Sequence, residues 1–214
     1  MVSCGALTGR HDRFDCGRKA MLIVTVAVLS ALLCWVYLHL ARRWQIVDHP
    51  NLRSSHTRPT PHAGGVPLLL SFFIGWSFYC WLGGYFFGDY VVMILLTFLL
   101  MLLGVVDDVF GLSVGLRFGA YTLCTLLGAA AVLTQSSVTG GLWLLLVFPL
   151  VTLTILWPLN LYNFMDGIDG LAAGQCVLAC FAAALFCSQT GGSEFYVITC
   201  SLLGAAHLGF LVLN

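Results

Sequence analysis

Charged residues are scarce in this chain. Lys, Arg, Asp and Glu make up 8% of its 214 residues, while 60% are hydrophobic and the mean hydropathy is +0.97. A soluble domain carries about 25% charged residues, so the composition excludes an ordinary soluble globular protein. The formal net charge is zero, and we expect no nucleic acid partner.

Several other signals are missing as well. The sequence contains no soluble domain, no internal repeat and no low-complexity tract. Its nine cysteines are scattered and lack the paired spacing of a zinc site or a secreted disulfide framework. Cys176 and Cys180 lie one helical turn apart and could form a metal pair, but small apolar fillers between helices are the better interpretation.

What the sequence does contain is a series of long apolar runs. A membrane-spanning helix needs about 20 apolar residues, and seven runs fit this requirement. We therefore predict an all-α, polytopic transmembrane helix bundle with short loops and antiparallel neighbours. The predicted spans are 21–41, 66–84, 90–106, 117–134, 142–159, 171–188 and 195–213.

Basic residues gather on one side of these spans. Alternation of the spans puts three loops on that side, 42–65, 107–116 and 160–170. The arginines in or beside these loops are Arg42, Arg43, Arg53, Arg58 and Arg117, whereas the opposite loops contain no Lys or Arg. By the positive-inside rule, the arginine-bearing side is cytoplasmic.

Residues 1–20 form a polar tail that disagrees with this topology, because they carry four basic residues on the side predicted to be external. The following apolar run is long enough to span and lacks a convincing cleavage site, so a signal peptide is not predicted. Because Met21 opens the span directly, we expect translation to begin there. The membrane domain is then 21–214.

Three polar segments interrupt the apolar runs on the predicted cytoplasmic side. The first, 48–65, presents Arg53, His56 and Arg58 among prolines and glycines that prevent a continuous helix. Guanidinium forks suit phosphate oxygens, and an imidazole adds a donor. A topology anchor needs no such scaffold, so we predict that these three side chains bind phosphate.

The second segment, GVVDD (104–108), ends the third span with two carboxylates. Acidic groups at a helix C-terminus oppose the macrodipole, and adjacent carboxylates repel unless a cation or a proton intervenes. Neighbours on a helix point about 100° apart. Asp107 and Asp108 are therefore predicted to have different roles. One supports a metal, and the other transfers a proton. The alternative is a solvated helix end.

The third segment, 160–174, carries an amide or carboxylate at every third position, Asn160, Asn163, Asp166 and Asp169. Gly167 and Gly170 predict that the helix loosens into a loop there. Four such groups along one cavity edge could bind a hard cation such as Mg²⁺, or sugar or ribose hydroxyls. Capping of the fifth span explains one of them but not their spacing.

Together the three segments resemble the polyprenyl-phosphate N-acetylhexosamine-1-phosphate transferase family, glycosyltransferase family 4 in the broad sense. The resemblance is carried by DHPNLRSSHTRPTPHAGG (48–65), GVVDD followed by Arg117, and LNLYNFMDGIDGLAAG (159–174). It covers 21–214 in layout. The first segment is similar to the branch that initiates O-antigen and similar surface glycans rather than to the peptidoglycan-precursor branch.

The resemblance implies attack of a polyprenyl (undecaprenyl) phosphate on the sugar-linked phosphate of a UDP-N-acetylhexosamine, with release of UMP. It implies Mg²⁺ or Mn²⁺ as cofactor and the cytoplasmic face of the bacterial inner membrane as location. Catalysis is then assigned to Asp107, Asp108 and Asp166, and metal binding to Asp166 and Asp169. Substrate binding is assigned to Arg53, His56, Arg58, Asn160 and Asn163. The amino sugar, the glycan pathway and the oligomeric state stay open.

Family members continue past the segment corresponding to Leu208–Asn214 into a Gly-Asp-x-Gly motif and a later histidine-containing loop. We therefore expect this chain to be the N-terminal two-thirds of such an enzyme. Two other interpretations stay open. One is an inactive truncated paralogue or scaffold. The other is an ion-coupled transporter, which would place its carboxylates near the membrane midplane and in repeated halves.

Overall fold

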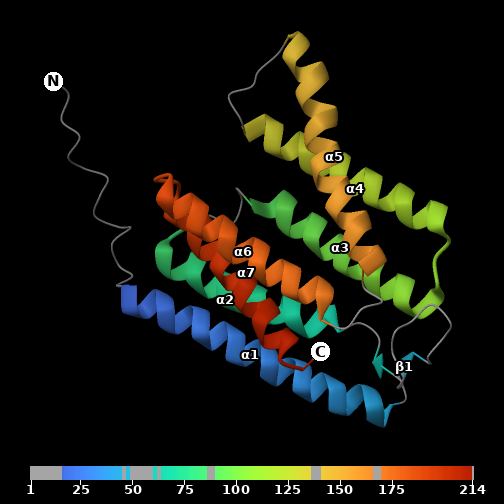
Figure 1. Cartoon of the computed structure of the whole chain (residues 1–214), viewed down its shortest axis with the longest axis vertical. Helices are drawn as coiled ribbons and strands as arrows, with labels where there is room; N and C mark the ends of the chain where they lie inside the picture. Colours follow the sequence, from blue (N-terminus) through green and yellow to red (C-terminus); the bar gives the residue numbers. More distant parts are fainter. Residues whose placement is uncertain are drawn as a thin grey trace. The chain divides into compact units, whose positions relative to one another are not determined.

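The computed structural model of the chain describes residues 16–44, 47–48, 60–61, 64–85, 90–135, 141–165 and 170–213. Within these ranges it contains seven helices and one short antiparallel ladder (Figure 1). The elements are α1 (Cys16–Arg43), β1 (Val47–Asp48), β2 (Thr60–Pro61), α2 (Gly65–Gly83), α3 (Val91–Phe110), α4 (Val114–Gln135), α5 (Leu142–Met165), α6 (Leu171–Gln189) and α7 (Glu194–Leu211). All seven helices are long and apolar enough to cross a membrane. The prediction of an all-α, multi-pass membrane protein is confirmed.

Four helices extend by three or more residues beyond the predicted spans, at ends that carry polar residues. They begin or end at Cys16 (α1), Phe110 (α3), Val114 (α4) and Met165 (α5). A hydropathy criterion stops a span near its first charge, but the backbone ladder continues until a residue breaks it. For α3 that residue is Gly111, whose φ of +62° is accessible mainly to glycine.

The helices fall into two compact units, and the first consists of α1, α2, α6 and α7 with the β-ladder. α7 packs against α1, α2 and α6 (Figure 1). Lys19 in the first turn of α1 forms an ion pair with Glu194 at the start of α7. Further along, the Ser30 hydroxyl donates to the Ala206 carbonyl at 2.7 Å. α1 and α7 therefore run in the same direction, as the alternation of spans predicts.

Small residues bring the helices of this first unit close together. A Cβ on Gly209 of α7 would lie 2.9 Å from the backbone nitrogen of Ala31, and one on Gly204 would lie 3.1 Å from the Cβ of Cys180. Close packing of this kind drives helix association in membranes, where lipid is as apolar as the side chains. Leu202 and Ala206, both fully buried, mark the centre of this core.

The second unit consists of α3, α4 and α5, with α4 packed against both neighbours. α4 contributes most of the buried side chains, including Thr125 and Ala129. Over its whole described length, α3 has no buried residue. Many of its apolar side chains are exposed, for example Leu95 and Phe98, and the others are half-buried, as expected of a helix that faces lipid or further protein.

Candidate active site

The first polar segment is closed by the β-ladder. Val47 pairs with Pro61 and Asp48 pairs with Thr60 in antiparallel register, and β2 contacts α1. This agrees with the prediction of a constrained, non-helical segment at its two ends. Arg53, His56 and Arg58 come between the two strands in the sequence and are outside the described residues, so their placement stays a prediction.

The ends of the first and third polar segments both reach the last turn of α7, within the first unit. A Cβ on Gly64 would lie 3.2 Å from Cε2 of Phe210, and one on Gly170 would lie 3.3 Å from Cδ1 of Leu211. Gly170 adopts a φ of +70° directly before α6, which a residue with a side chain rarely accepts. Gly64 and Gly170, the described ends of these two segments, therefore lie at the same end of the first unit, as the alternation of spans predicts.

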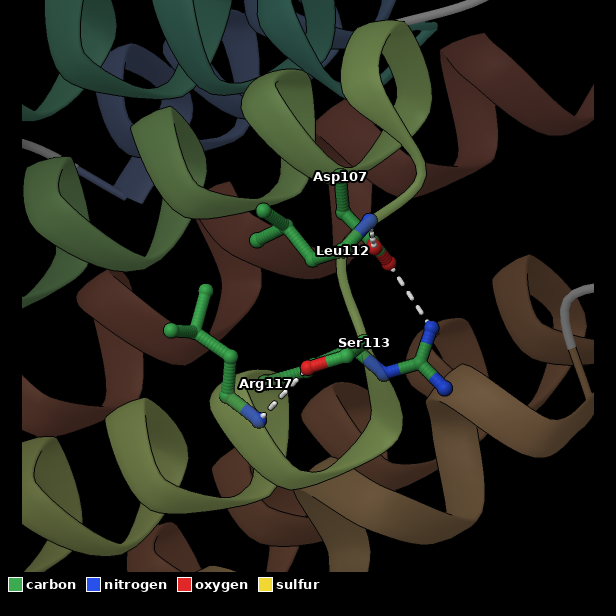
Figure 2. Close-up of polar contacts among 5 residues, drawn as sticks. Asp107, Leu112, Ser113 and Arg117 are labelled. Carbon is green, nitrogen blue, oxygen red and sulfur yellow. Dashed lines mark hydrogen bonds and ion pairs between the residues drawn. The ribbon is translucent and has the colours of Figure 1, made fainter.

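The second polar segment lies in the last two turns of α3, shortly before the turn Gly111–Ser113 that leads to α4 (Figure 2). Gly111 ends the helix in the left-handed conformation, and its N–H donates to the Asp107 carbonyl at 2.8 Å. The N–H of Leu112 donates to the Asp107 carboxylate, Oδ1, at 3.0 Å. Asp107 thus accepts hydrogen bonds from the turn through both its backbone and its side chain.

The second oxygen of this carboxylate is held from α4. Nη1 of Arg117 lies 2.8 Å from Oδ2 of Asp107 (Figure 2). Ser113 caps α4 by accepting the N–H of Leu116 at 3.3 Å on its hydroxyl. The Asp107 side chain is 14% exposed and that of Arg117 is 28% exposed, so the pair is shielded from full solvation. Asp108, the next residue of α3, is exposed.

Only part of the third polar segment is described. Asn160 lies in α5 and is half-buried, and its amide Nδ2 donates to the Leu156 carbonyl at 3.0 Å. Asn163 belongs to the same helix, but its side chain is outside the description. Asp166 and Asp169 are outside the described residues altogether. The predicted stripe of four oxygen-bearing groups, and the loosening of the helix at Gly167, therefore stay predictions.

Among the described residues, no group of three His, Cys, Asp or Glu side chains is arranged to hold a metal. A metal at Asp107 would also have to compete with the guanidinium already bound there. The two carboxylates assigned to the metal, Asp166 and Asp169, lie outside the described residues. Mg²⁺ or Mn²⁺ at this site accordingly stays a prediction that rests on the oxygen-donor chemistry of the third segment.

The pairing of Asp107 with Arg117 was not predicted from the sequence. The sequence indicated that a cation or a proton must lie beside the two carboxylates, but Arg117 was assigned only to membrane topology and to the family resemblance. The three-residue connection Gly111–Ser113 between two helices brings the ends of α3 and α4 together. Opposite charges on the two sides of such a short turn are the signal that could have indicated the pair.

Known proteins share this sequence pattern. The model of glycosyl transferase family 4 matches residues 90–214, which contain the second and third polar segments. The undecaprenyl-phosphate alpha-N-acetylglucosaminyl 1-phosphate transferase of Escherichia coli K12 is 26% identical over 199 residues, covering 90% of this chain and 53% of the relative. The probable undecaprenyl-phosphate N-acetylglucosaminyl 1-phosphate transferase of Bacillus subtilis is 28% identical, covering 92% of this chain and 56% of the relative.

The decaprenyl-phosphate N-acetylglucosaminephosphotransferase of Mycobacterium tuberculosis H37Rv is also 28% identical, covering 98% of this chain and 57% of the relative. The chain therefore spans about half the length of the curated relatives it matches, rather than the expected two-thirds. The family match extends over more than half of the chain and includes the turn that joins Asp107 to Arg117. On this evidence the chain belongs to glycosyl transferase family 4.

Proposed function

We propose that this chain takes part in transferring an N-acetylhexosamine 1-phosphate from a UDP-sugar to a polyprenyl phosphate. In this reaction an oxygen of the lipid phosphate attacks the sugar-bearing β-phosphorus. The bond from that phosphorus to the oxygen bridging to the α-phosphate breaks, and UMP leaves. The product is a polyprenyl diphospho-sugar, the first intermediate of a lipid-linked glycan.

The observation that carries the proposal is the family match over 90–214, together with relatives named as polyprenyl-phosphate N-acetylglucosamine 1-phosphate transferases. The described chemistry is compatible with it. A cationic side chain and carboxylates lie together at the end of an apolar helix, at Arg117, Asp107 and Asp108. Such a position suits a reaction between a membrane lipid and a water-soluble nucleotide sugar.

The main task of the site is to offset the electrostatic repulsion between its two substrates. Two phosphate groups, both anionic, must come together, and cations aimed at the developing charge offset their repulsion. We assign Arg53, His56 and Arg58 to phosphate oxygens, and Asn160 and Asn163 to the nucleotide sugar. Asp166 and Asp169 are assigned to Mg²⁺ or Mn²⁺, which supplies positive charge beside the phosphates when bound.

The carboxylates of the second segment, Asp107 and Asp108, are assigned to the lipid phosphate. One of the two accepts a proton, and the other supports the metal. Asp166 completes the catalytic set. We place the reaction at the cytoplasmic face of a bacterial inner membrane. The arginine distribution supports this orientation, because the predicted loops on the opposite side contain no Lys or Arg.

The experiment uses membranes from cells that express the whole chain. They are incubated with tritiated UDP-N-acetylglucosamine, undecaprenyl phosphate and Mg²⁺, and radioactivity is measured after extraction into butanol. We expect label in the lipid phase together with release of UMP. Asp107→Asn and Asp166→Asn should each abolish transfer while membrane insertion is retained. Arg42→Gln, an exposed arginine outside the site, is the matched control and should transfer normally.

Retained transfer in both aspartate variants would contradict the residue assignments. A wild-type chain that inserts correctly but transfers nothing would instead support the inactive paralogue or scaffold. Movement of label into sealed vesicles without formation of a lipid product would support the transporter.

A further inference from the structure

The Arg117 side chain is less exposed, and makes a closer contact, than an arginine that only anchors the membrane topology would need. Arg42 and Arg43, at the end of α1, are exposed, as anchoring arginines at a membrane surface are. The Arg117 side chain is only 28% exposed, and its guanidinium meets a carboxylate that is 14% exposed. Its charge is therefore used in a contact inside the protein rather than in the headgroup region.

The contact fixes the orientation of one carboxylate. Oδ2 of Asp107 accepts from Arg117 at 2.8 Å, and Oδ1 accepts from the Leu112 N–H at 3.0 Å (Figure 2). With one oxygen held from α4 and the other from the turn, the carboxylate plane cannot rotate freely. A carboxylate offers about four lone-pair directions, so each oxygen keeps capacity for a further partner.

The two charges are also placed against the helix dipoles. Asp107 lies in the last turn of α3, where a negative charge is disfavoured, and Arg117 lies in the first turn of α4, where a positive charge is disfavoured. The stability of the helix ends alone would favour the opposite arrangement of the pair. A need for a carboxylate in this place explains the observed arrangement, in the way that strain at functional sites is explained.

We propose that Arg117 is a positioning residue for the sugar-phosphate transfer. It holds the Asp107 carboxylate in the orientation that the reaction uses, and it acts on the substrates only through Asp107. This inference rests on the proposed function, because it assigns Arg117 a task within that same site.

The first test is steady-state kinetics of the whole chain in membranes, with UDP-N-acetylglucosamine and undecaprenyl phosphate. Arg117→Gln should lower kcat on the order of 100-fold, the cost of a misplaced reacting group, while KM for both substrates changes less than about twofold. Arg117→Lys keeps the charge but not the fork and should recover most of kcat. Added guanidinium ion should partly restore the kcat of the Arg117→Ala variant.

Ser113→Ala is the matched control in the same turn. It removes the cap that Ser113 gives to Leu116 without touching Asp107, so the turn is weakened while the carboxylate stays held. Its kcat should equal that of the wild type. An equal loss of kcat in Ser113→Ala and Arg117→Gln would show that only the integrity of the turn matters, and would overturn the proposal.

A second measurement does not need activity. Hydrogen exchange of the Leu112 amide, resolved by mass spectrometry, reports whether Oδ1 of Asp107 still accepts its N–H. Exchange should accelerate in Arg117→Gln but not in Arg42→Gln. Unchanged exchange in Arg117→Gln overturns the proposal whatever the kinetics.

Two kinetic results would also overturn it while leaving the proposed function standing. One is Arg117→Gln with wild-type kcat. The other is a raised KM with unchanged kcat, which would identify Arg117 as a direct phosphate ligand. A folded wild-type chain without any transfer would remove the proposed function itself.

Discussion

The two units of the chain pack their helices in different ways, and their glycines show it. In the first unit, three helical glycines lie where a neighbouring helix passes close, Gly75 beside Val26, Gly204 beside Cys180 and Gly209 beside Ala31. In the second unit, a Cβ on Gly104, Gly115 or Gly119 would meet nothing within 4 Å, and one on Gly128 would be in ordinary van der Waals contact with Cδ1 of Leu96, at 3.7 Å. Close backbone approach holds the first unit together, whereas none of the described helical glycines of the second unit meets a neighbouring helix as closely.

Side-chain hydrogen bonds also join the helices of the first unit. Ser30 of α1 bonds to the backbone of α7 from a fully buried position, and Trp76 of α2 bonds to Thr199 of α7 at 3.2 Å. In the second unit, α3 is joined to α4 by the Asp107–Arg117 pair and a short turn. Local stability within one protein varies in this way. The first unit therefore contains the rigid core, and the second contains the end of α3 that carries Asp107.

The largest effect is expected from Gly209→Ala. Its Cβ would press on the backbone of α1, 2.9 Å from the Ala31 nitrogen, and backbone cannot rotate away as a side chain can. We expect a loss of about 3 kcal/mol in the free energy of unfolding, at the upper end for overpacked cores. Unfolding in detergent micelles, followed by circular dichroism, measures it.

The matched control is Gly174→Ala in α6, where a Cβ meets nothing within 4 Å. It should be neutral or slightly stabilising. Equal losses in the two variants would mean that close approach of α1 and α7 does not hold the first unit together.

A smaller effect is expected from Ser30→Ala, which removes the interhelical hydrogen bond to the Ala206 carbonyl. Bonds of this kind in membrane proteins contribute about 0.6 to 1.7 kcal/mol, and we expect a loss of about 1 kcal/mol. Ser188→Ala is the control, because Ser188 is exposed and bonds only within its own helix, to the Leu185 carbonyl. The comparison is contradicted if both variants unfold at the same temperature.

The smallest effect, and one of opposite sign, is expected from Gly119→Ala in the second unit. The position is exposed, helical and open, so the substitution removes chain entropy from the unfolded state without a clash. A gain of about 0.5 kcal/mol is expected, measured by the same unfolding experiment. A clear loss of stability would reveal a close neighbour at α4 and weaken the contrast between the units.

Much of this fold could be predicted from the sequence, because apolar length determines which segments can span a membrane. All seven predicted spans correspond to helices. The ends were less accurate: α3 continues through Asp107 and Asp108 to Phe110, and α4 begins before Arg117. Hydropathy records where charge begins, whereas helices end where a residue such as Gly111 leaves the helical conformation.

The candidate site could be predicted only in part. The residue types at Asp107 and Asp108 indicated metal support and proton transfer, but hydropathy carries no information about which cation approaches a carboxylate. That Arg117 is this cation at Asp107 follows from the geometry of the turn. The close contact at Gly209 was inaccessible for the same reason, since a sequence does not state which helix passes a given glycine. Arg53, His56, Arg58, Asp166 and Asp169 lie outside the described residues and remain sequence predictions.

The proposed function requires that this chain take part in transferring sugar phosphate rather than sugar. The most direct test supplies membranes containing the chain with UDP-N-acetylglucosamine labelled with ³²P at the β-phosphate, and with undecaprenyl phosphate. If the account is right, the ³²P enters the lipid product and the released UMP is unlabelled. If the ³²P instead leaves with UDP while the sugar enters the lipid, or if correctly inserted protein forms no lipid product, the account is contradicted.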